Sequence, residues 1–201
     1  MTEIDFRNIA EADHVPIIRR DTEEYLRRFI SKNKIKHVLE YGTAIGYSAY
    51  FFSEICKCKA VFSVEKDEYA FEIAKRNLGM LDSLERIHLI KGDALRVTKM
   101  IIEESNAAFD LIFIDGGKSH YLELIQEAMK LCKVGGYILS DDIWQRGLTK
   151  MDPNAVARKH RTSMRNMQEY LEYICNTSEL ETEIFDVGDG LAESKYIGRN
   201  G

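Results

Sequence analysis

The sequence contains few prolines, which interrupt helices and strands, and few cysteines, which can cross-link a fold. Its 201 residues include 2 prolines and 4 cysteines, and there is 1 tryptophan. Cys56 and Cys58 form a C-x-C pair with no second pair nearby, so neither a metal-binding cysteine cluster nor a disulfide framework is indicated. Because nothing in the composition marks a linker, we expect a single domain over residues 1–201.

Long apolar runs are also absent, and none approaches the roughly 20 residues that a membrane-spanning helix needs. The stretch from Met1 to Asp5 has no basic segment followed by an apolar core, so no signal peptide is expected. The 28 basic and 33 acidic side chains give a net charge of −5, which argues against polyanion binding over the whole surface but allows a local basic patch. These absences favour a cytoplasmic globular protein without membrane contact.

Two glycines three residues apart follow an apolar run and an acid, within the stretch Val38 to Ser48. This pattern predicts a buried strand, a tight turn and the start of a helix. The spacing Gly42-x-x-x-Gly46 differs from the dinucleotide fingerprint G-x-G-x-x-G, and no Lys-Ser/Thr follows as in a P-loop. Since Glu40 suits an ammonium group better than a pyrophosphate, the loop favours a ligand with a cationic end. An ordinary strand-to-helix turn is the alternative.

The acid pattern continues at the ends of the later strands. Glu65 ends the second apolar strand, where related folds place a carboxylate on a ribose diol, and Asp93, Asp115 and Asp141 end the next three. Repeated strand and helix patterns, followed by two strands around Gly188-Asp189-Gly190, predict an α/β fold. We expect a mostly parallel seven-stranded sheet with a C-terminal antiparallel hairpin and helices on both faces. Ligands bind beyond the carboxyl ends of parallel strands, so the acids mark the predicted site.

Apolar periodicity gives expectations for the helices. It predicts a helix over residues 19–32, and one from about Ser119 to Cys132 that ends at Gly135-Gly136. A long helix is expected to begin at Pro153 and reach about Asn176. Residues 1–16 show no such pattern and are expected to be irregular.

Several of these residues resemble the cofactor motifs of Rossmann-like methyltransferases, namely Glu40-x-Gly42-x-x-x-Gly46, Glu65, Gly92-Asp93-Ala94 and Phe113-Ile114-Asp115. The resemblance implies a methyltransferase domain with an N-terminal helical extension. It also implies that S-adenosylmethionine is bound by Glu40, Gly42, Gly46, Ser48, Glu65, Asp93, Ala94 and Asp115. In that family pattern, Glu65 binds the ribose hydroxyls, Asp93 and Ala94 border the adenine, and Ser48 binds the cofactor carboxylate.

Asp115, Asp141 and Asp142 form a second group, because three carboxylates at adjacent strand ends suit Mg²⁺ or a similar hard cation. The alternative is that Asp141 and Asp142 only cap the following loop. The spacing Asp115-x-x-Lys118, then Asp141-Asp142, resembles the divalent-cation-dependent O-methyltransferases of the catechol and caffeoyl-coenzyme A type. This resemblance implies that Lys118 is the catalytic base, with Asp115 beside it, and that the three carboxylates are metal ligands. That family has Asn where this chain has Asp142.

Arg158, Arg161 and Arg165 share one face of the predicted long helix, which indicates either a solvated surface or a phosphate-binding stripe. Four segments resemble the bacterial tRNA 5-hydroxyuridine methyltransferase group, namely Val15–Ile18, Gly42–Ser48, Arg158–Thr162 and Val187–Ala192. The resemblance implies O-methylation of 5-hydroxyuridine in the tRNA anticodon loop. It also implies 5-methoxyuridine as the product and contacts between the three arginines and the RNA.

Three alternatives remain open at this point. A small catechol-like phenol would use the same cofactor and metal motifs, because it offers the same vicinal pair of oxygens. A protein of another class, an RNA-binding module with a vestigial cofactor pocket, is disfavoured by the retained acids and Lys118. A nicotinamide oxidoreductase is disfavoured by the glycine spacing. We also expect a homodimer, because the N-terminal helix carries apolar residues that could pair.

Overall fold

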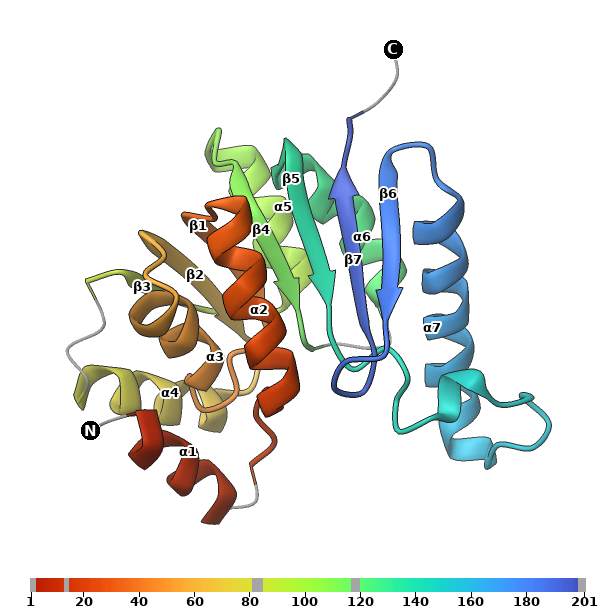
Figure 1. Ribbon diagram of the computed structural model, residues 1–201, viewed down its shortest axis with the longest axis horizontal. Helices are drawn as coiled ribbons and strands as arrows, with labels where there is room; N and C mark the ends of the chain where they lie inside the picture. Colours follow the sequence, from red (N-terminus) through yellow and green to blue (C-terminus); the bar gives the residue numbers. More distant parts are fainter. Residues whose placement is uncertain (1–2, 13–14, 81–84, 117–119, 199–201) are drawn as a thin grey trace. The chain divides into compact units, whose positions relative to one another are not determined.

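The computed structural model describes residues 3–12, 15–80, 85–116 and 120–198 (Figure 1). They fall into two compact units, unit 1 (Met1–Val97) and unit 2 (Thr98–Gly201). The single domain expected from the sequence stays a prediction. The helices are α1 (Glu3–Ala12), α2 (Arg20–Asn33), α3 (Tyr47–Tyr50), α4 (Glu68–Met80), α5 (Ala94–Glu104), α6 (Tyr121–Ala128) and α7 (Arg158–Asn176). The strands are β1 (His37–Tyr41), β2 (Ala60–Glu65), β3 (Ile87–Lys91), β4 (Phe109–Ile114), β5 (Cys132–Ser140), β6 (Leu180–Phe185) and β7 (Leu191–Tyr196).

Unit 1 is built on three parallel strands in the order β3-β2-β1. The register places Val38 beside Val61 and Val61 beside Ile87, and all three side chains are buried. Helix α4 packs on β2 and β3. Asp67 accepts a hydrogen bond from the Ala70 amide (2.9 Å), so its side chain caps the start of α4. Apolar runs therefore become the central strands of unit 1, as the sequence predicts.

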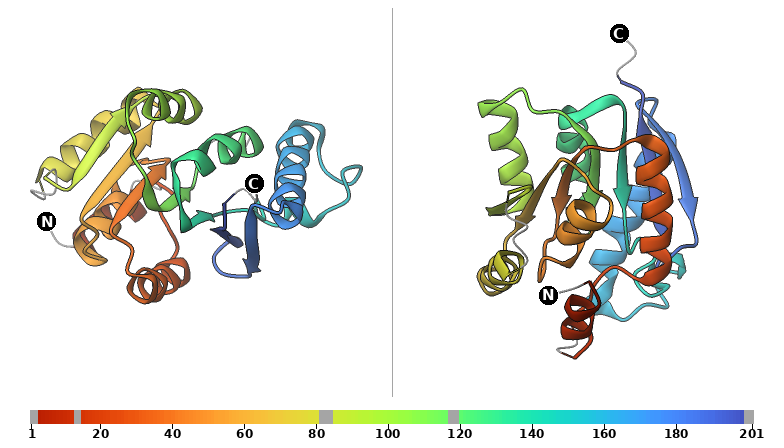
Figure 2. Two further views of the ribbon diagram at one scale, coloured as in Figure 1. Left: turned by 90° about the horizontal axis from the view of Figure 1, so that it is seen from above. Right: turned by 60° about the vertical axis from the view of Figure 1, so that its left-hand side comes forward.

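The N-terminal segment differs from the expectation, because α1 forms where an irregular segment was predicted. Phe6 and Ala10 are one helical turn apart and both are fully buried. Two buried positions one turn apart, next to an exposed Ile9, are too short a pattern to be recognised in the sequence. Figures 1 and 2 show α1 near the first turn of α2, which covers Arg20–Asn33 and confirms the helix predicted at residues 19–32.

Unit 2 contains four strands in the order β4-β5-β7-β6. Strands β4 and β5 are parallel, whereas β7 runs antiparallel to both β5 and β6. Helix α7 lies beside β6 and also packs on α6 (Figure 1). Met164, Met167 and Ile174 on α7 are buried, so these residues form the apolar side of the helix. The seven strands, mostly parallel with an antiparallel C-terminal hairpin, confirm the predicted fold class.

Two predicted helix boundaries in unit 2 are wrong. The helix predicted to reach Cys132 gives way to a single 3-10 turn after Ala128, and Gly135 and Gly136 lie inside β5. The pairing of β4 with β5 shifts register near its start, and a Cβ on Gly136 would come within 2.9 Å of the Lys133 carbonyl oxygen. The glycine therefore allows close approach of backbones in an irregular strand, rather than ending a helix.

The long helix begins at Arg158 and not at Pro153. The amides of Asn154 and Ala155 both bond to Asp152, at its side chain (2.7 Å) and its carbonyl (2.9 Å). Pro153 thus sits inside a tight turn, a position that its fixed φ also suits. None of the helices in the part of the chain that the structure describes is long and apolar enough to cross a membrane.

Candidate functional site

The glycine loop of unit 1 joins β1 to α3 through an unusual backbone path. Gly42 and Gly46 have φ values of 105° and 92°, and Ala44 between them has a φ of 48°. A Cβ on Gly46 would also lie 3.1 Å from the Leu78 side chain. Both glycines therefore hold conformations that L-residues with side chains rarely adopt. This loop is brought next to the end of β2, as the sequence predicts.

Glu65, at the end of β2, is fixed by backbone donors. Its Oε2 accepts a hydrogen bond from the Ala44 amide (3.0 Å), and its Oε1 accepts one from the Asp67 amide (2.8 Å). The side chain is half-buried. Each carboxylate oxygen has a second lone pair, so Glu65 can still accept hydrogen bonds from a pair of ligand hydroxyls. This geometry suits the predicted contact with a ribose diol.

Glu40, near the end of β1, is fully buried. Its Oε2 accepts a hydrogen bond from the Ser63 hydroxyl, whereas Oε1 meets no donor in bonding geometry among the described residues. Burial raises the pKa of this carboxyl to about 7; the hydroxyls of Ser48 and Ser63 oppose the rise, and the Glu65 charge adds to it. A buried acceptor of this kind would gain most from a cationic donor. The predicted cofactor residue Ser48 is buried close to the same carboxyl.

Asp93 has a structural task in addition to its predicted one. Its Oδ1 accepts hydrogen bonds from the amides of Leu95 (3.1 Å) and Arg96 (3.2 Å), so it caps the start of α5. Gly92 lies so close to this helix that a Cβ would meet the Val97 side chain at 2.7 Å. The Asp93-Ala94 turn follows β3 within unit 1, and its expected contact with adenine stays a prediction.

In unit 2, three carboxylates lie around one buried phenol. Asp115, Asp141 and Asp142 all act on Tyr121, whose pKa is raised well above its ordinary value, first by burial and then by these charges and by Tyr170. The Ile114 carbonyl accepts hydrogen bonds from the Asp141 amide (3.0 Å) and the Tyr121 hydroxyl (3.5 Å). The end of β4 therefore anchors both the acidic pair and the phenol, and the three predicted acids come into one neighbourhood.

The donor chemistry of this neighbourhood suits a hard divalent cation, but its side chains are not arranged as a ready-made cage. Among the described residues, no group of three or more His, Cys, Asp or Glu side chains has metal-binding geometry. Asp142 has a φ of 58°, and its amide bonds to Asp141 Oδ1 (2.8 Å). Metal binding at these acids is a prediction, and Lys118, the predicted base, lies outside the residues that the structure describes.

The three arginines of α7 do not behave alike. Arg158 and Arg165 are exposed, whereas Arg161 is partly buried. The Arg161 guanidinium donates hydrogen bonds to the carbonyls of Val156 (2.8 Å) and Asn154 (3.5 Å). Arg161 therefore holds the preceding turn, which makes it less available to a phosphate than its two neighbours. Sequence spacing alone could not separate these roles.

Two further residues with polar contacts were not predicted from the sequence, Ser63 in unit 1 and Tyr170 in unit 2. Ser63 bridges Glu40 and the Thr43 hydroxyl, with an Oγ–Oγ distance of 2.5 Å to Thr43. Tyr170 stacks edge-on against Tyr121 at 5.2 Å and bonds to Ser140 at 2.5 Å. A serine inside the apolar strand Ala60–Glu65 is a signal that could have been used. The Tyr170 contact depends on the packing of α7 on α6, which no spacing encodes.

Comparison with known proteins identifies one family. Residues 7–197 match the family described as O-methyltransferase. A catechol O-methyltransferase of Niastella koreensis is 27% identical over 125 residues, which are 62% of this chain and 57% of the relative. The O-methyltransferase ankF of Aspergillus thermomutatus is 32% identical over 148 residues, which are 71% of this chain and 57% of that protein. The chain thus spans little more than half the length of these two relatives.

A solved structure agrees over most of the chain. A Staphylococcus aureus protein with the provisional name caffeoyl-CoA O-methyltransferase is 28% identical, with a TM-score of 0.89, and the match covers 98% of this chain and 92% of that one. The Bacillus cereus O-methyltransferase, solved in complex with SAH, is 20% identical with a TM-score of 0.83 over 96% of this chain and 90% of its own. At that identity the second likeness concerns the fold alone.

Proposed function

Because this chain belongs to the O-methyltransferase family, we propose that it transfers the methyl group of S-adenosylmethionine to an acceptor oxygen, and that the acceptor is 5-hydroxyuridine at the wobble position of tRNA. The product would be 5-methoxyuridine. Cofactor binding is assigned to unit 1, through the glycine loop, Glu40 and Glu65. Acceptor activation is assigned to the acids of unit 2.

The observation that carries this proposal is the pair of carboxylates beside the glycine loop. Glu40 is fully buried, its Oε1 meets no donor in bonding geometry in the described part of the chain, and Glu65 is held by two backbone amides. A ligand with both an ammonium group and a ribose diol would satisfy the first carboxylate and bridge the second. S-adenosylmethionine carries both groups. A dinucleotide would instead bring a pyrophosphate toward the loop that Glu40 precedes.

A divalent cation, Mg²⁺ or a similar ion, is part of the proposal. Asp115, Asp141 and Asp142 would hold it, because hard carboxylate oxygens are the ligands that such ions prefer. A cation bound there lowers the pKa of the acceptor hydroxyl. Lys118 is the proposed proton acceptor. A hard cation also suits an acceptor with two vicinal oxygens, and a 5-hydroxyuracil offers such a pair in its 5-oxygen and its O4 carbonyl.

The tRNA acceptor is supported by the exposed basic end of α7. Arg158, Lys159 and Arg165 are exposed there, on a chain whose net charge is −5. Local positive charge of this kind is what phosphate contacts require, whatever the overall charge. A wobble base is single-stranded, so it can be presented to an active site without melting a duplex.

The homodimer expected from the sequence is also part of the proposal. Light scattering at the working concentration tests whether two copies of the chain pair.

A small catechol-like phenol is the second candidate acceptor. The names of the relatives favour it, since one is a catechol O-methyltransferase and another is provisionally a caffeoyl-CoA enzyme. Such a substrate needs the same cofactor and acidic groups. It does not need the exposed arginines, because a catechol carries no phosphate. The arginines therefore separate the two acceptors experimentally.

The experiment offers labelled S-adenosylmethionine and either tRNA containing 5-hydroxyuridine or a panel of catechols. The informative variant is the double change Arg158→Ala, Arg165→Ala, with Arg161 kept because it holds the preceding turn. Arg76→Ala is the matched control, since Arg76 is an exposed arginine on α4. We expect methylated tRNA with the wild type and the control, and a loss of about tenfold or more in tRNA affinity with the double variant at low salt.

Rapid catechol methylation that is unaffected by the double change, with tRNA inert, would reject the tRNA acceptor and leave the methyltransferase. RNA binding without methylation of any acceptor would favour a binding module. No binding of S-adenosylhomocysteine would reject the cofactor assignment itself.

A further inference from the structure

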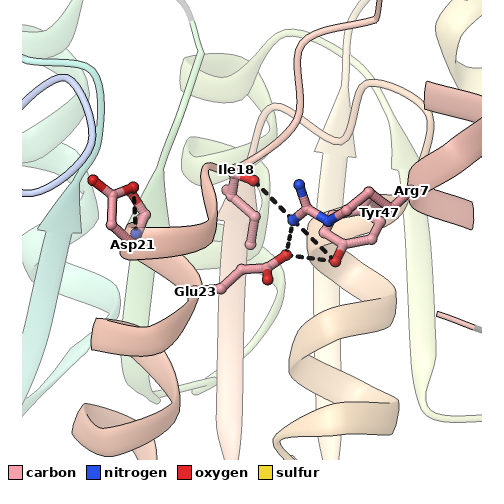
Figure 3. A network of polar contacts seen from close by, with 6 residues as sticks. Arg7, Ile18, Asp21, Glu23 and Tyr47 are labelled. Atoms are coloured by element: carbon pink, nitrogen blue, oxygen red, sulfur yellow. Dashed lines mark hydrogen bonds and ion pairs between the residues drawn. The ribbon is translucent and has the colours of Figure 1, made fainter. Parts of the chain in front are cut away.

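A buried polar network joins three helices of unit 1 (Figure 3). Arg7 on α1 donates through Nη2 to the carbonyl of Ile18 (3.2 Å) and to the Tyr47 hydroxyl (3.2 Å), and it forms an ion pair with Glu23 on α2. The Tyr47 hydroxyl donates in turn to Glu23 Oε1. The side chains of Arg7, Glu23 and Tyr47 thus point toward one another from α1, α2 and the start of α3.

This network is withdrawn from solvent. The exposed fractions are 7% for Arg7, 6% for Glu23 and 1% for Tyr47. Taking a guanidinium and a carboxylate out of water is costly, and a buried pair often stabilises a fold no more than apolar side chains of the same size would. Stability alone is therefore a weak reason for this arrangement. Its other effect is geometric, because each hydrogen bond fixes the position of a group.

The group that becomes fixed is attached to the glycine loop. Tyr47 follows Gly46 directly and is the first residue of α3. The backbone of Gly46 adopts the left-handed conformation, and no side chain caps the start of α3. The Tyr47 ring also packs edge-on against Phe6 of α1, with centroids 5.6 Å apart. The end of the loop is therefore held by α1 and α2, together with Asn77 of α4, whose side-chain amide donates to the Ile45 carbonyl (3.1 Å), rather than by a local cap.

Resting on the proposed cofactor role of the loop, we propose that Arg7 and Glu23 are positioning residues that hold Tyr47, and through it the Gly42–Ser48 loop, in the conformation that binds S-adenosylmethionine. Arg7 and Glu23 do not touch the cofactor in this scheme. They act through the Tyr47 hydroxyl on the end of a loop whose start is held by β2, since the Gly42 amide bonds to the Val64 carbonyl (3.0 Å) and the Ala44 amide bonds to Glu65. Cofactor affinity then depends on the N-terminal helices.

The test compares affinity for S-adenosylhomocysteine, measured by calorimetry at a temperature where every variant is folded. Tyr47→Phe removes only the hydroxyl and keeps the ring that packs on Phe6. Glu23→Gln removes the charge that pairs with Arg7. Glu24→Gln is the matched control, because Glu24 is the next residue of α2 and its ion pair with Arg28 is exposed. Arg7→Lys keeps the charge but loses the planar fork.

We expect the Kd for S-adenosylhomocysteine to rise about tenfold in both variants, because Tyr47→Phe loses hydrogen bonds to charged groups and Glu23→Gln leaves the buried Arg7 without its counter-charge. The double variant Tyr47→Phe, Glu23→Gln should show less than the product of the two effects, since both act on one network. Arg7→Lys should lie between wild type and Glu23→Gln. In turnover, KM for the cofactor should rise while kcat changes little.

A purely structural network gives a different pattern. The variants would then melt at lower temperature, while the Kd of the folded protein stayed at the wild-type value, and the positioning proposal would be rejected. Tyr47→Phe keeps the test decisive if Glu23→Gln fails to fold. A wild-type protein that does not bind S-adenosylhomocysteine would overturn the proposed function as well, whereas wild-type binding with unchanged variants overturns the positioning role alone.

Discussion

A Cβ on Gly190 would lie 2.4 Å from Cδ1 of the Trp144 indole. Lys150 lies over that indole, with Nζ 4.0 Å from the ring centroid, and the indole Nε1 donates to Asp186 at 2.9 Å. The Trp144 amide also bonds to the Asp189 carbonyl (2.8 Å). The turn between β6 and β7 therefore packs against the segment that directly follows the acidic pair at the end of β5. Trp144 makes the contacts that connect these two segments of unit 2.

Replacing Gly190 should show how much the packing of Trp144 against the β6–β7 turn contributes to the free energy of unfolding. We expect Gly190→Ala to lower the free energy of unfolding by about 2–4 kcal/mol, because the new methyl group overlaps the indole and the position has a φ of 87°. Gly147→Ala is the control. Gly147 has a φ of 85°, but an added methyl group would meet nothing within 4 Å, so this variant should lose only about 1 kcal/mol. Urea unfolding measures both, and equal losses would contradict the steric explanation.

Glu40 should make the protein less stable as the pH rises. Its pKa is raised from an ordinary 4.5 to about 7, so between these values the folded state holds a proton that the unfolded state has released. Stability is therefore expected to fall as pH rises through this window, by on the order of 3 kcal/mol, and to level off above it. Unfolding curves from pH 4 to 8 measure the trend.

The variant Glu40→Gln should remove this trend, because it mimics the neutral carboxyl at every pH. It is expected to be more stable than the wild type above pH 7, while binding S-adenosylhomocysteine more weakly. Glu72→Gln, at an exposed position of α4, is the matched control. An identical pH trend in wild type and Glu40→Gln would show that another group is responsible.

The acids of unit 2 should differ in how well they tolerate an amide. Asp115→Ala and Asp141→Ala are expected to abolish turnover and divalent-ion binding, with a smaller effect on cofactor affinity. Asp142→Asn should retain activity, because an amide oxygen also binds hard cations and Asn tolerates the left-handed backbone of position 142. Calorimetry with Mg²⁺ or Mn²⁺ measures binding, and full activity in excess EDTA would remove the metal from the proposal.

Single changes in α7 should separate structure from RNA contact. Arg161→Ala is expected to lower the free energy of unfolding by about 1–2 kcal/mol, because two backbone carbonyls lose their donor. Arg165→Ala should leave stability unchanged within about 0.5 kcal/mol and reduce the salt dependence of tRNA binding. Thermal unfolding and a salt series of filter binding test the pair. Equal effects of the two changes on tRNA binding would argue that Arg161 contacts the RNA too.

Much of the fold could be predicted because its signals are local. The apolar runs that became β1 and β4 could hardly be accommodated outside a core, and the glycines of the β1–α3 loop needed positive φ. The carboxyl ends of parallel strands then fixed where Glu65 and Asp115 would lie. For the same reason the family resemblance could be placed on individual residues, and membership of the family is confirmed.

Other features depend on contacts between distant residues. In the sequence, Gly136 has the pattern of a glycine that ends a helix. In the structure it lies in β5, where a Cβ would come within 2.9 Å of the Lys133 carbonyl oxygen. Arg161 looked like one of three equivalent arginines, since spacing does not reveal which side chain turns back to the backbone. The ion pair of Arg7 with Glu23 joins two segments with different expectations. Residues 1–16 were expected to be irregular, whereas the segment that carries Glu23 was predicted to be a helix. Such pairings are decided by packing and not by sequence pattern.

The 40 positions that separate Arg7 from Tyr47 also bear on the order in which unit 1 assembles. Closing a loop of that length costs entropy that is recovered only when the partner already has its final geometry. We therefore expect Glu23, β1 and the turn at Gly46 to be in place before the Arg7 guanidinium exchanges water for its three acceptors. Helix α1 should form early as a fluctuating turn and dock late, so that its amides exchange with deuterium faster than those of β1.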